Sequence, residues 1–409
     1  MSVRSAILLL VLLPLGLVAQ TREELGSSYL AYPTRTQQAG MPADLQPVYL
    51  SHYGRHGSRW LTEDARYEKV LQELDTHELT PYGKDIRQRL EIVWQDARGR
   101  SGDLTRVGER QHHDIARRMV ANFPQLFQDA DLIIAQSSTS RRCMMSMMAA
   151  CEGIKEVRPA ITIQRSAHER DMDTINHESE ALQAFKKGES WKTTEQALYQ
   201  KQAHYQRIMS RLFVTPSEIA DPIGLFDGLY WIASDMQNVE LGQLSFYDLF
   251  TYEELQEYWK AINYRMYVTN GPSSLNQGIM AESSENLLQA IVQDADRALH
   301  DRKASVHLRF GHDSALLRLL TRMGIMECQA PQEGGKLLND QDVDIVARYW
   351  QDYRLVPMAA NLQLVFYRDA NSRIHVRFLL NEEPAHLPLA ESLPALYDWE
   401  EVKNLWNKQ

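Results

Sequence analysis

Residues 47–59, PVYLSHYGRHGSR, contain the pattern that decides the fold class of this chain. The first seven, PVYLSHY, are rich in apolar and aromatic side chains and predict a buried strand. Glycines at both ends of the next stretch stop the strand and enclose the pair Arg55 and His56. Because ligands bind at the carboxyl ends of strands in an open α/β sheet, this pattern predicts a reactive loop at such an end.

Two further strand-loop-helix units follow the same plan. Residues 131–135 (DLIIA) predict a short strand, and SSTS at 137–140 leads into the helical pattern RRCMMSMMAACEGI. Residues 304–310 (ASVHLRF) predict a third strand, which is followed by His312, Asp313 and the helical pattern ALLRLLTRMGI. The repeated unit predicts an α/β fold with a mostly parallel sheet flanked by helices.

The segments between these units complete the expected architecture. Within residues 102–112, GDLTRVGERQH, Thr105 is placed to cap the N-terminus of a helix. Residues 361–369 and 373–381, NLQLVFYRD and RIHVRFLLN, predict two strands joined by a turn. Residues 157–286 carry helical patterns rich in Gln, Glu, Tyr and Trp, and no parallel strand is expected there.

The predicted strands therefore come from both ends of the chain. This indicates a discontinuous α/β core of residues 21–156 and 287–409, with an inserted, mainly α-helical cap of residues 157–286. Residues 21–45 are polar and punctuated by Pro and Gly, so they are expected to run over the surface as an extended leader.

The N-terminal residues 1–20, MSVRSAILLLVLLPLGLVAQ, predict a secretory signal peptide. Their apolar run is shorter than the roughly 20 residues that a membrane span needs. The protein is therefore expected to be exported, periplasmic or extracellular, with no membrane span after signal cleavage. An odd and sparse set of cysteines excludes a disulfide scaffold, so buried thiols are expected. They are Cys143, Cys151 and Cys328.

The formal net charge is −10, and loss of the signal peptide removes one Arg and no acidic residue, which gives about −11. No nucleic-acid partner is expected of so acidic a chain. A few arginines in a cleft can still attract a small anionic substrate. No cofactor and no metal are expected, because the paired histidines lack the spacing of metal ligands. These are His112 with His113 and His168 with His177.

The three predicted loops carry side chains suited to phosphate chemistry. A guanidinium presents a planar fork of donors that matches phosphate oxygens. A histidine can supply a nucleophile and a carboxyl group can supply an acid, so the combination predicts phosphoryl transfer. The residues are Arg55, His56 and Arg59 in the first loop, Arg141 and Arg142 in the second, and His312 and Asp313 in the third.

The sequence resembles a known family at these loops. RHGSR at 55–59 is similar to the RHGxR signature of histidine phosphatases, and Gly-His-Asp at 311–313 resembles the acid phosphatase and phytase branch. SSTSRRCMMSMMA, GDLTRVGERQH and VPMAANLQ resemble further segments of that branch. The Arg-Cys form of the second motif is closest to multiple inositol polyphosphate phosphatases. Those carry His-Ala-Glu where this chain has His312, Asp313 and Ser314, which leaves phytases and general acid phosphatases open.

The resemblance implies a role for each of these residues. His56 would be the nucleophile that forms a phosphohistidine, and Asp313 would be the proton donor to the leaving group. Motif register carries the role in the second loop to Arg142 rather than Arg141. The phosphate-binding residues would then be Arg55, Arg59, Arg142 and His312, with no metal required.

The expected function is that of an exported histidine acid phosphatase, a phosphomonoesterase acting on small phosphorylated substrates, with inositol polyphosphates such as phytate expected first. The alternative enzyme is a broad-specificity acid or sugar phosphatase. The alternative of another class is a noncatalytic phospholigand-binding protein. The oligomeric state is left open. An enzyme for inositol polyphosphates is expected to add basic side chains from the insertion, with candidates Lys186, Lys187, Lys192 and Arg207.

Overall fold

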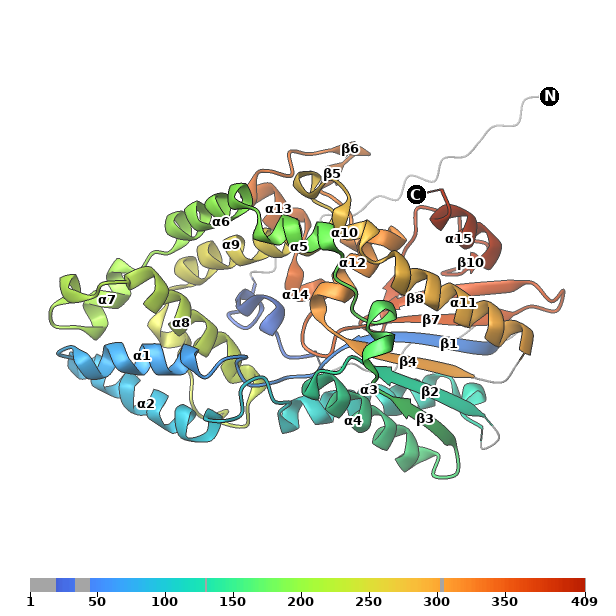
Figure 1. Cartoon of the computed structure of the whole chain (residues 1–409), viewed down its shortest axis with the longest axis horizontal. Helices are drawn as coiled ribbons and strands as arrows, with labels where there is room; N and C mark the ends of the chain where they lie inside the picture. Colours follow the sequence, from blue (N-terminus) through green and yellow to red (C-terminus); the bar gives the residue numbers. More distant parts are fainter. Residues whose placement is uncertain (1–19, 34–44, 129–130, 302–304, 409) are drawn as a thin grey trace.

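The computed structural model of the chain describes residues 20–33, 45–128, 131–301 and 305–408. Apart from Gln20, the predicted signal peptide lies outside these residues. The described chain forms an α/β part around one sheet and a helical part beside it (Figure 1). Among the described helices, none combines the length and the apolar character that a membrane crossing requires.

The parallel half of the sheet contains the three predicted strand-loop-helix units. β1 pairs in parallel with β4, β4 with β2, and β2 with β3. Loops leave the carboxyl ends of β1, β2 and β4, and they determine where the reactive side chains lie. The strands are β1 (Gln46–Arg55), β2 (Leu132–Ser137), β3 (Thr162–Ser166) and β4 (Val306–Gly311).

The antiparallel half continues the sheet on the other side of β1. β7 (Asn361–Arg368) pairs with β1, and β8 (Ile374–Leu380) pairs with β7, which confirms the predicted pair of C-terminal strands. The short strands β9 (Glu383–Ala385) and β10 (Tyr397–Asp398) both pair with β8. The order across the sheet is β10-β8-β7-β1-β4-β2-β3. The predicted fold class is confirmed, with a sheet that is mixed.

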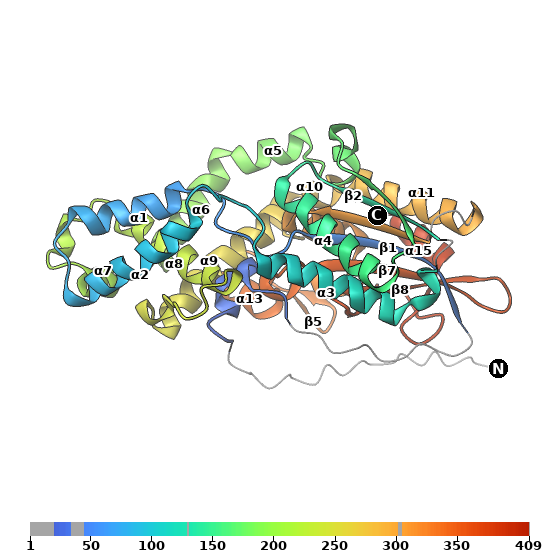
Figure 2. The ribbon, with the colours of Figure 1, turned by 90° about the horizontal axis from the view of Figure 1, so that it is seen from below.

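Helices cover both faces of the sheet, because the side chains of β1 alternate between two apolar clusters. Leu50 belongs to the cluster with α3 and α4, whereas Tyr49 and Tyr53 belong to the cluster with α11 and α12. Figure 2 shows α3 and α4 lying along one face of the sheet. The bounds are α3 (Arg106–Asn122), α4 (Arg141–Val157), α11 (Glu285–Asp301) and α12 (Asp313–Met323).

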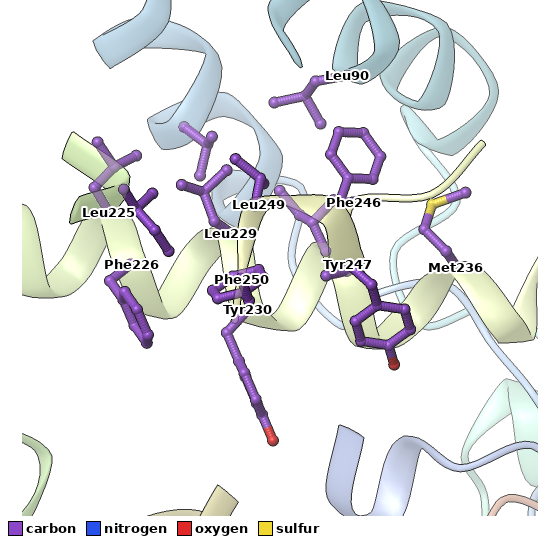
Figure 3. Close-up of a cluster of buried hydrophobic side chains, with 14 of the residues drawn as sticks. Leu90, Leu225, Phe226, Leu229, Tyr230, Met236, Phe246, Tyr247, Leu249 and Phe250 are labelled. Atoms are coloured by element: carbon purple, nitrogen blue, oxygen red, sulfur yellow. The ribbon is translucent and has the colours of Figure 1, made fainter. Parts of the chain in front are cut away.

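A third apolar cluster, rich in aromatic side chains, holds the helical part together. Figure 3 shows its centre, where Phe226 and Leu229 of α8 lie with Leu249 and Phe250. Residues 65–97 supply α1 and α2 to the same cluster, so the helical part draws on more than the insertion. The helices are α1 (Ala65–Thr76), α2 (Pro81–Ala97), α7 (Gln206–Leu212), α8 (Pro222–Asp235) and α9 (Tyr252–Asn270).

One parallel strand, β3, lies inside the segment in which none was expected, so that prediction is wrong. β3 has the polar sequence TIQRS and pairs with β2 at the edge of the sheet. Thr162, Gln164 and Arg165 are exposed. An edge strand with exposed side chains lacks the apolar pattern by which a buried strand is recognised.

The prediction of an extended surface leader is also wrong for its first residues. The 3₁₀ turn η1 (Glu24–Tyr29) buries residues 25–29 between the helical part and the sheet (Figure 1). Hydrogen bonds hold this polar segment, among them the bond that the Ser27 hydroxyl donates to the buried carboxylate of Asp352. The polar composition of this segment therefore gave no indication that it is buried. Residues 34–44 of the expected leader lie outside the described residues.

Candidate active site

The carboxyl ends of β1, β4 and β2 lie side by side. In the register of the parallel strands, Arg55 is opposite Gly311 and Ser137 is opposite Phe310. The loops that leave these strands therefore open at one edge of the sheet, where α4 and α12 begin. All three predicted loops meet at this edge, beside two helix N-termini that favour anions.

The N-terminus of α3 supports the Arg-His loop through close backbone contact. A Cβ on Gly57 would lie 2.6 Å from the carbonyl oxygen of Gly108, and one on Gly108 would lie 2.3 Å from that of Ser58. Both positions therefore require glycine. Thr105 caps α3 as predicted, and Gln111 Oε1 accepts the N–H of Ser58 at 2.9 Å. The segment GDLTRVGERQH thus fixes the loop that carries His56.

His56 is buried, with 2% of its surface exposed. Its Nδ1 lies 2.9 Å from the carbonyl oxygen of Gly57. Because a carbonyl oxygen can only accept, Nδ1 carries the proton and Nε2 keeps the lone pair in the neutral ring. Burial and three neighbouring guanidiniums hold the pKa of His56 well below its ordinary 6.5. The guanidiniums are those of Arg55, Arg142 and Arg59.

Arg55 is fully buried and forms an ion pair with Asp313, with Nη2 at 2.9 Å from Oδ2. Its Nη1 donates to the carbonyl oxygens of Ser28 and Val356. Asp313 is the first residue of α12, and its Oδ1 also accepts the N–H of Ser314 at 2.7 Å. Burial raises the pKa of Asp313, but Arg55, His312 and the N–H of Ser314 together outweigh burial and leave that pKa below its ordinary value.

Arg59 lies against the ring of Tyr29. Its Nη2 donates to the Tyr29 hydroxyl at 3.0 Å, and its Cζ lies 4.7 Å from the ring centre. Nη1 donates to the carbonyl oxygen of Trp60 at 3.0 Å. The Nε atoms of Arg55, Arg59 and Arg142 are buried and have no hydrogen-bond partner among the described residues. These arginines therefore retain donors that suit an anion.

The structure separates the two arginines of the second loop. Arg142 is half-buried, and a Cβ on Gly102 would lie 3.4 Å from its Nη1. Its charge adds to burial in lowering the pKa of His56. Arg141 is 73% exposed and pairs with Asp103 at 3.2 Å. Arg142 therefore lies at the site and Arg141 lies at its rim.

The ring of His312 lies 5.6 Å from that of His56, in an edge-to-face arrangement. His312 immediately precedes α12, and its Nε2 lies 3.4 Å from Ser138 Oγ and 3.7 Å from Cys143 Sγ. Burial, with the charge of Arg142, lowers the pKa of His312 to about 4. The ring is therefore a neutral hydrogen-bonding group in mildly acidic solution.

Several residues beside the site were missed because they come from segments without an active-site motif. Tyr29 belongs to η1, and Asn238 follows the end of α8. Asn238 Nδ2 donates to the carbonyl oxygen of Tyr29 at 2.9 Å, and its Oδ1 accepts from Ser58 Oγ at 2.6 Å. Burial raises the pKa of Asp235 to about 7, against the effect of Arg59. Polar residues ending an apolar helix, SDMQN, were the one sequence pattern that could have pointed to them.

Lys186 is the predicted basic candidate whose ion-pair partner is also affected by a residue of the site. It stands on α5 (Glu180–Lys187) and pairs with Glu178 at 3.1 Å. The pKa of Glu178 is lowered, against burial, by Lys186, Arg318 and His312. The other candidates differ: Lys187 is exposed, Lys192 pairs with Glu189, and Arg207 pairs with Glu254.

The histidines and cysteines considered as metal ligands or reactive groups outside the site do not form such a site among the described residues. Within the described residues, no three His, Cys, Asp or Glu side chains gather into a group that could hold a metal ion. His112 is buried with its ring 5.4 Å from that of Phe310, and His113 pairs with Glu156 at 2.7 Å. The three cysteines are free and buried, as predicted.

Comparison with known proteins identifies the class to which this fold and site belong. Residues 54–381 match the model of the histidine phosphatase superfamily (branch 2), and the chain belongs to that superfamily. Multiple inositol polyphosphate phosphatase 1 of Gallus gallus is 26% identical over 379 residues, which cover 84% of this chain and 78% of that protein. Its Homo sapiens counterpart is 25% identical over 358 residues, which cover 76% and 66%. The predicted family and the predicted enzyme class, a histidine-type phosphomonoesterase, are confirmed.

Solved structures share the fold at low sequence identity. The multiple inositol polyphosphate phosphatase of Bifidobacterium longum, solved with inositol hexasulfate, superposes with a TM-score of 0.76 at 16% identity and covers 94% of this chain and 97% of its own. The phytase from D. castellii gives a TM-score of 0.71 at 16% identity, with coverage of 95% and 85%. The arrangement of sheet and helical part is therefore that of histidine acid phosphatases.

Proposed function

We propose that this protein is an exported histidine acid phosphatase that removes phosphate from inositol polyphosphates. The observation that carries the proposal is the state of His56, whose neutral ring has Nδ1 bound to a carbonyl and Nε2 free for attack. The substrate class is supported by the relatives, which are multiple inositol polyphosphate phosphatases, and by the Bifidobacterium longum complex with inositol hexasulfate. Export is inferred from residues 1–20 alone.

In the first step, the Nε2 lone pair of His56 forms a bond to phosphorus while the ester P–O bond breaks. Arg55, Arg59 and Arg142 hold the nonbridging oxygens and stabilise the charge that develops on them. His312 adds a hydrogen bond from a neutral ring. Asp313 gives its proton to the departing alkoxide, so an alcohol leaves and a phosphohistidine remains.

In the second step, water attacks the phosphorus and the N–P bond breaks. The carboxylate of Asp313, left by the first step, accepts the proton of the attacking water. Inorganic phosphate leaves, and His56 returns to its neutral form with Nδ1 still bound to Gly57. The same pocket serves both displacements, since the three guanidiniums face the phosphoryl group throughout.

Mildly acidic solution suits both residues that carry out the chemistry. His56 stays neutral there because its pKa is depressed by burial and by positive neighbours. Asp313 must be protonated, although its ion pair with Arg55 keeps it ionised in the free protein. A substrate phosphate competes for Arg55, which weakens that pair and raises the pKa of Asp313 in the complex.

A substrate with several phosphates is favoured by the setting of Lys186. This ammonium stands on a helix of the insertion and pairs with Glu178, whose pKa is also lowered by His312. The sequence His312-Asp313-Ser314, which departs from His-Ala-Glu, keeps a broad-specificity acid phosphatase as the second candidate.

The proposal is tested by phosphate release from phytate, glucose 1-phosphate and an aryl phosphate, at acid and neutral pH with a chelator present. Wild type is compared with His56→Ala and with the matched control His300→Ala, whose side chain is 90% exposed. We expect release by wild type and the control, with phytate preferred, and none by His56→Ala. Release from every monoester at similar rates would favour the broad-specificity enzyme, and no release by wild type would favour a phospholigand-binding protein.

A further inference from the structure

Residues 20–30, called here the N-terminal segment, contact the Arg-His loop that carries His56. No sequence motif in this segment indicates that contact. Leu25 and Ser27 are fully buried, and Tyr29 is 7% exposed. In Figure 1 its turn η1 lies between the helical part and the sheet, beside α14 (Asp352–Leu355). A polar, Gly-containing segment therefore occupies an interior position next to the proposed phosphate pocket.

Two consecutive residues of the N-terminal segment contact two different arginines of the pocket. The carbonyl oxygen of Ser28 accepts from Nη1 of Arg55. The hydroxyl of Tyr29 accepts from Nη2 of Arg59 at 3.0 Å, and its ring centre lies 4.7 Å from Cζ of the same guanidinium. Arg59 is thus held at its edge by an oxygen and on its face by a ring, so both its position and its plane are fixed.

Tyr29 is itself held in place by the helical part. Its carbonyl oxygen accepts from Asn238 Nδ2 at 2.9 Å, and its ring lies 4.8 Å from that of Trp231. The neighbouring Tyr230 donates to the carbonyl oxygen of Leu25 at 2.7 Å. Figure 3 shows the ring of Tyr230 leaving the apolar cluster on the side away from Leu90. The helical part therefore anchors the segment, and the segment reaches the arginines.

We propose that Tyr29 is a positioning residue for the phosphatase reaction, which orients Arg59 so that its free Nε and remaining N–H groups face the phosphate. The inference rests on the proposed function. Arg59 already uses Nη1 for the carbonyl of Trp60 and Nη2 for Tyr29, while its Nε has no partner among the described residues. Without the Tyr29 hydroxyl, Nη2 loses its anchor and the guanidinium can turn out of the pocket.

The test compares Tyr29→Phe, which removes the hydroxyl and keeps the ring, with Tyr29→Leu, which removes both. The matched control is Tyr247→Phe, because Tyr247 is a buried tyrosine that also borders the N-terminal segment, near Gly26, and its hydroxyl accepts from Gln237 instead of from an arginine of the pocket. The readouts are kcat and KM for an aryl phosphate, inhibition by inorganic phosphate, the amount of phosphohistidine formed per protein, and the melting temperature.

For Tyr29→Phe we expect KM and the inhibition constant of phosphate to rise about tenfold, the usual effect of losing one hydrogen bond to a charged group. For Tyr29→Leu we expect about a hundredfold, since the cation–π contact is lost as well. Tyr247→Phe should leave both constants unchanged. The melting temperature of Tyr29→Phe should stay close to that of the wild type.

A merely structural role would give a different result. If Tyr29→Phe lowers the melting temperature or the fraction of protein that forms phosphohistidine but leaves KM and the phosphate constant unchanged, the positioning role is overturned while the proposed function stands. If both Tyr29 variants match the wild type in every readout, the inference is likewise overturned. If wild type neither releases phosphate nor forms phosphohistidine, the proposed function fails first and takes the inference with it.

Discussion

The Nη2 atom of Arg55 lies 2.9 Å from Oδ2 of Asp313, although Arg55 is completely buried and Asp313 is 26% exposed. This ion pair joins the end of β1 to the first residue of α12, so it links two of the three loops of the site. Together with His312 and the N–H of Ser314, it keeps the pKa of Asp313 below its ordinary value in the free protein, against the effect of burial. Asp313, the proposed acid, is therefore ionised until a substrate phosphate binds Arg55 and weakens the ion pair.

Replacing Asp313 by Asn removes the proton donor and keeps the shape of the side chain. We expect turnover of phytate or glucose 1-phosphate, whose alkoxides need a proton, to fall about a hundredfold or more. Turnover of an aryl phosphate should fall far less, because its leaving group departs without one. Asp103→Asn, which removes a carboxylate at the rim that pairs with Arg141, is the control. Equal losses on both ester types would remove Asp313 from the acid role.

Arg141 and Arg142 are adjacent in sequence and give a matched pair of variants. Arg142→Ala should lower kcat/KM for every monoester about a hundredfold, because a charged donor to the transition state is lost. Arg141→Ala should stay close to the wild type, since that side chain is 73% exposed and points to Asp103. The measurement is steady-state hydrolysis of an aryl phosphate. The opposite ranking would reassign the second loop to Arg141.

Much of the site could be predicted from sequence because its residues sit in short loops directly after strands. The strand that ends at Arg55 and the one that ends before His312 each have a clear apolar pattern, and parallel strands bring their carboxyl ends together. The fold class follows from the same repeated unit. Choosing Arg142 over Arg141 required the register of a family motif, since both have the same chemistry.

The contributions of Tyr29, Asn238 and Asp235 could not be predicted. Tyr29 and Asn238 reach the site through hydrogen bonds to Arg59 and to a backbone carbonyl, and Asp235 acts on Arg59 through its charge. Such contacts between distant segments leave no periodic pattern. Strand β3 was not predicted for a related reason, because an edge strand needs no apolar face. Apolar burial can be predicted from periodic sequence patterns. The burial of polar groups by tertiary contacts cannot, because it produces no such pattern.

Lys186 provides a test of the substrate class that is separate from catalysis. Lys186→Gln should raise KM for phytate about fivefold, since one charge interaction with a distal phosphate is lost. KM for an aryl monophosphate should not change, because that substrate has no second phosphate to bind. Lys192→Gln is the control, as Lys192 is an exposed lysine of the same insertion that pairs with Glu189. Equal effects on both substrates would contradict a distal-phosphate role.

Buried histidines predict that the folded protein loses stability in acid. A histidine whose pKa is lower in the native state than in the unfolded chain resists protonation, so unfolding takes up a proton as the pH falls below 6.5. Each such group lowers the free energy of unfolding by about 1.4 kcal/mol per pH unit until its native pKa is reached. Burial lowers the pKa of His52 to about 3 and that of His112, His307 and His312 to about 4.

Carboxylates with a raised pKa act in the opposite direction, and one of them is Asp227, whose pKa is raised by burial. Burial raises the pKa of Asp235 to about 7 and that of Asp352 to about 6, so these groups favour the native state as the pH falls through those values. The histidines outnumber them, and the net result is a melting temperature that decreases from pH 6.5 to pH 4. Thermal unfolding at half-unit steps of pH measures this. His112→Gln should reduce the dependence of the melting temperature on pH. The control His300→Gln, at an exposed position, should not change it. If His112→Gln leaves this dependence unchanged, His112 is protonated in the native state.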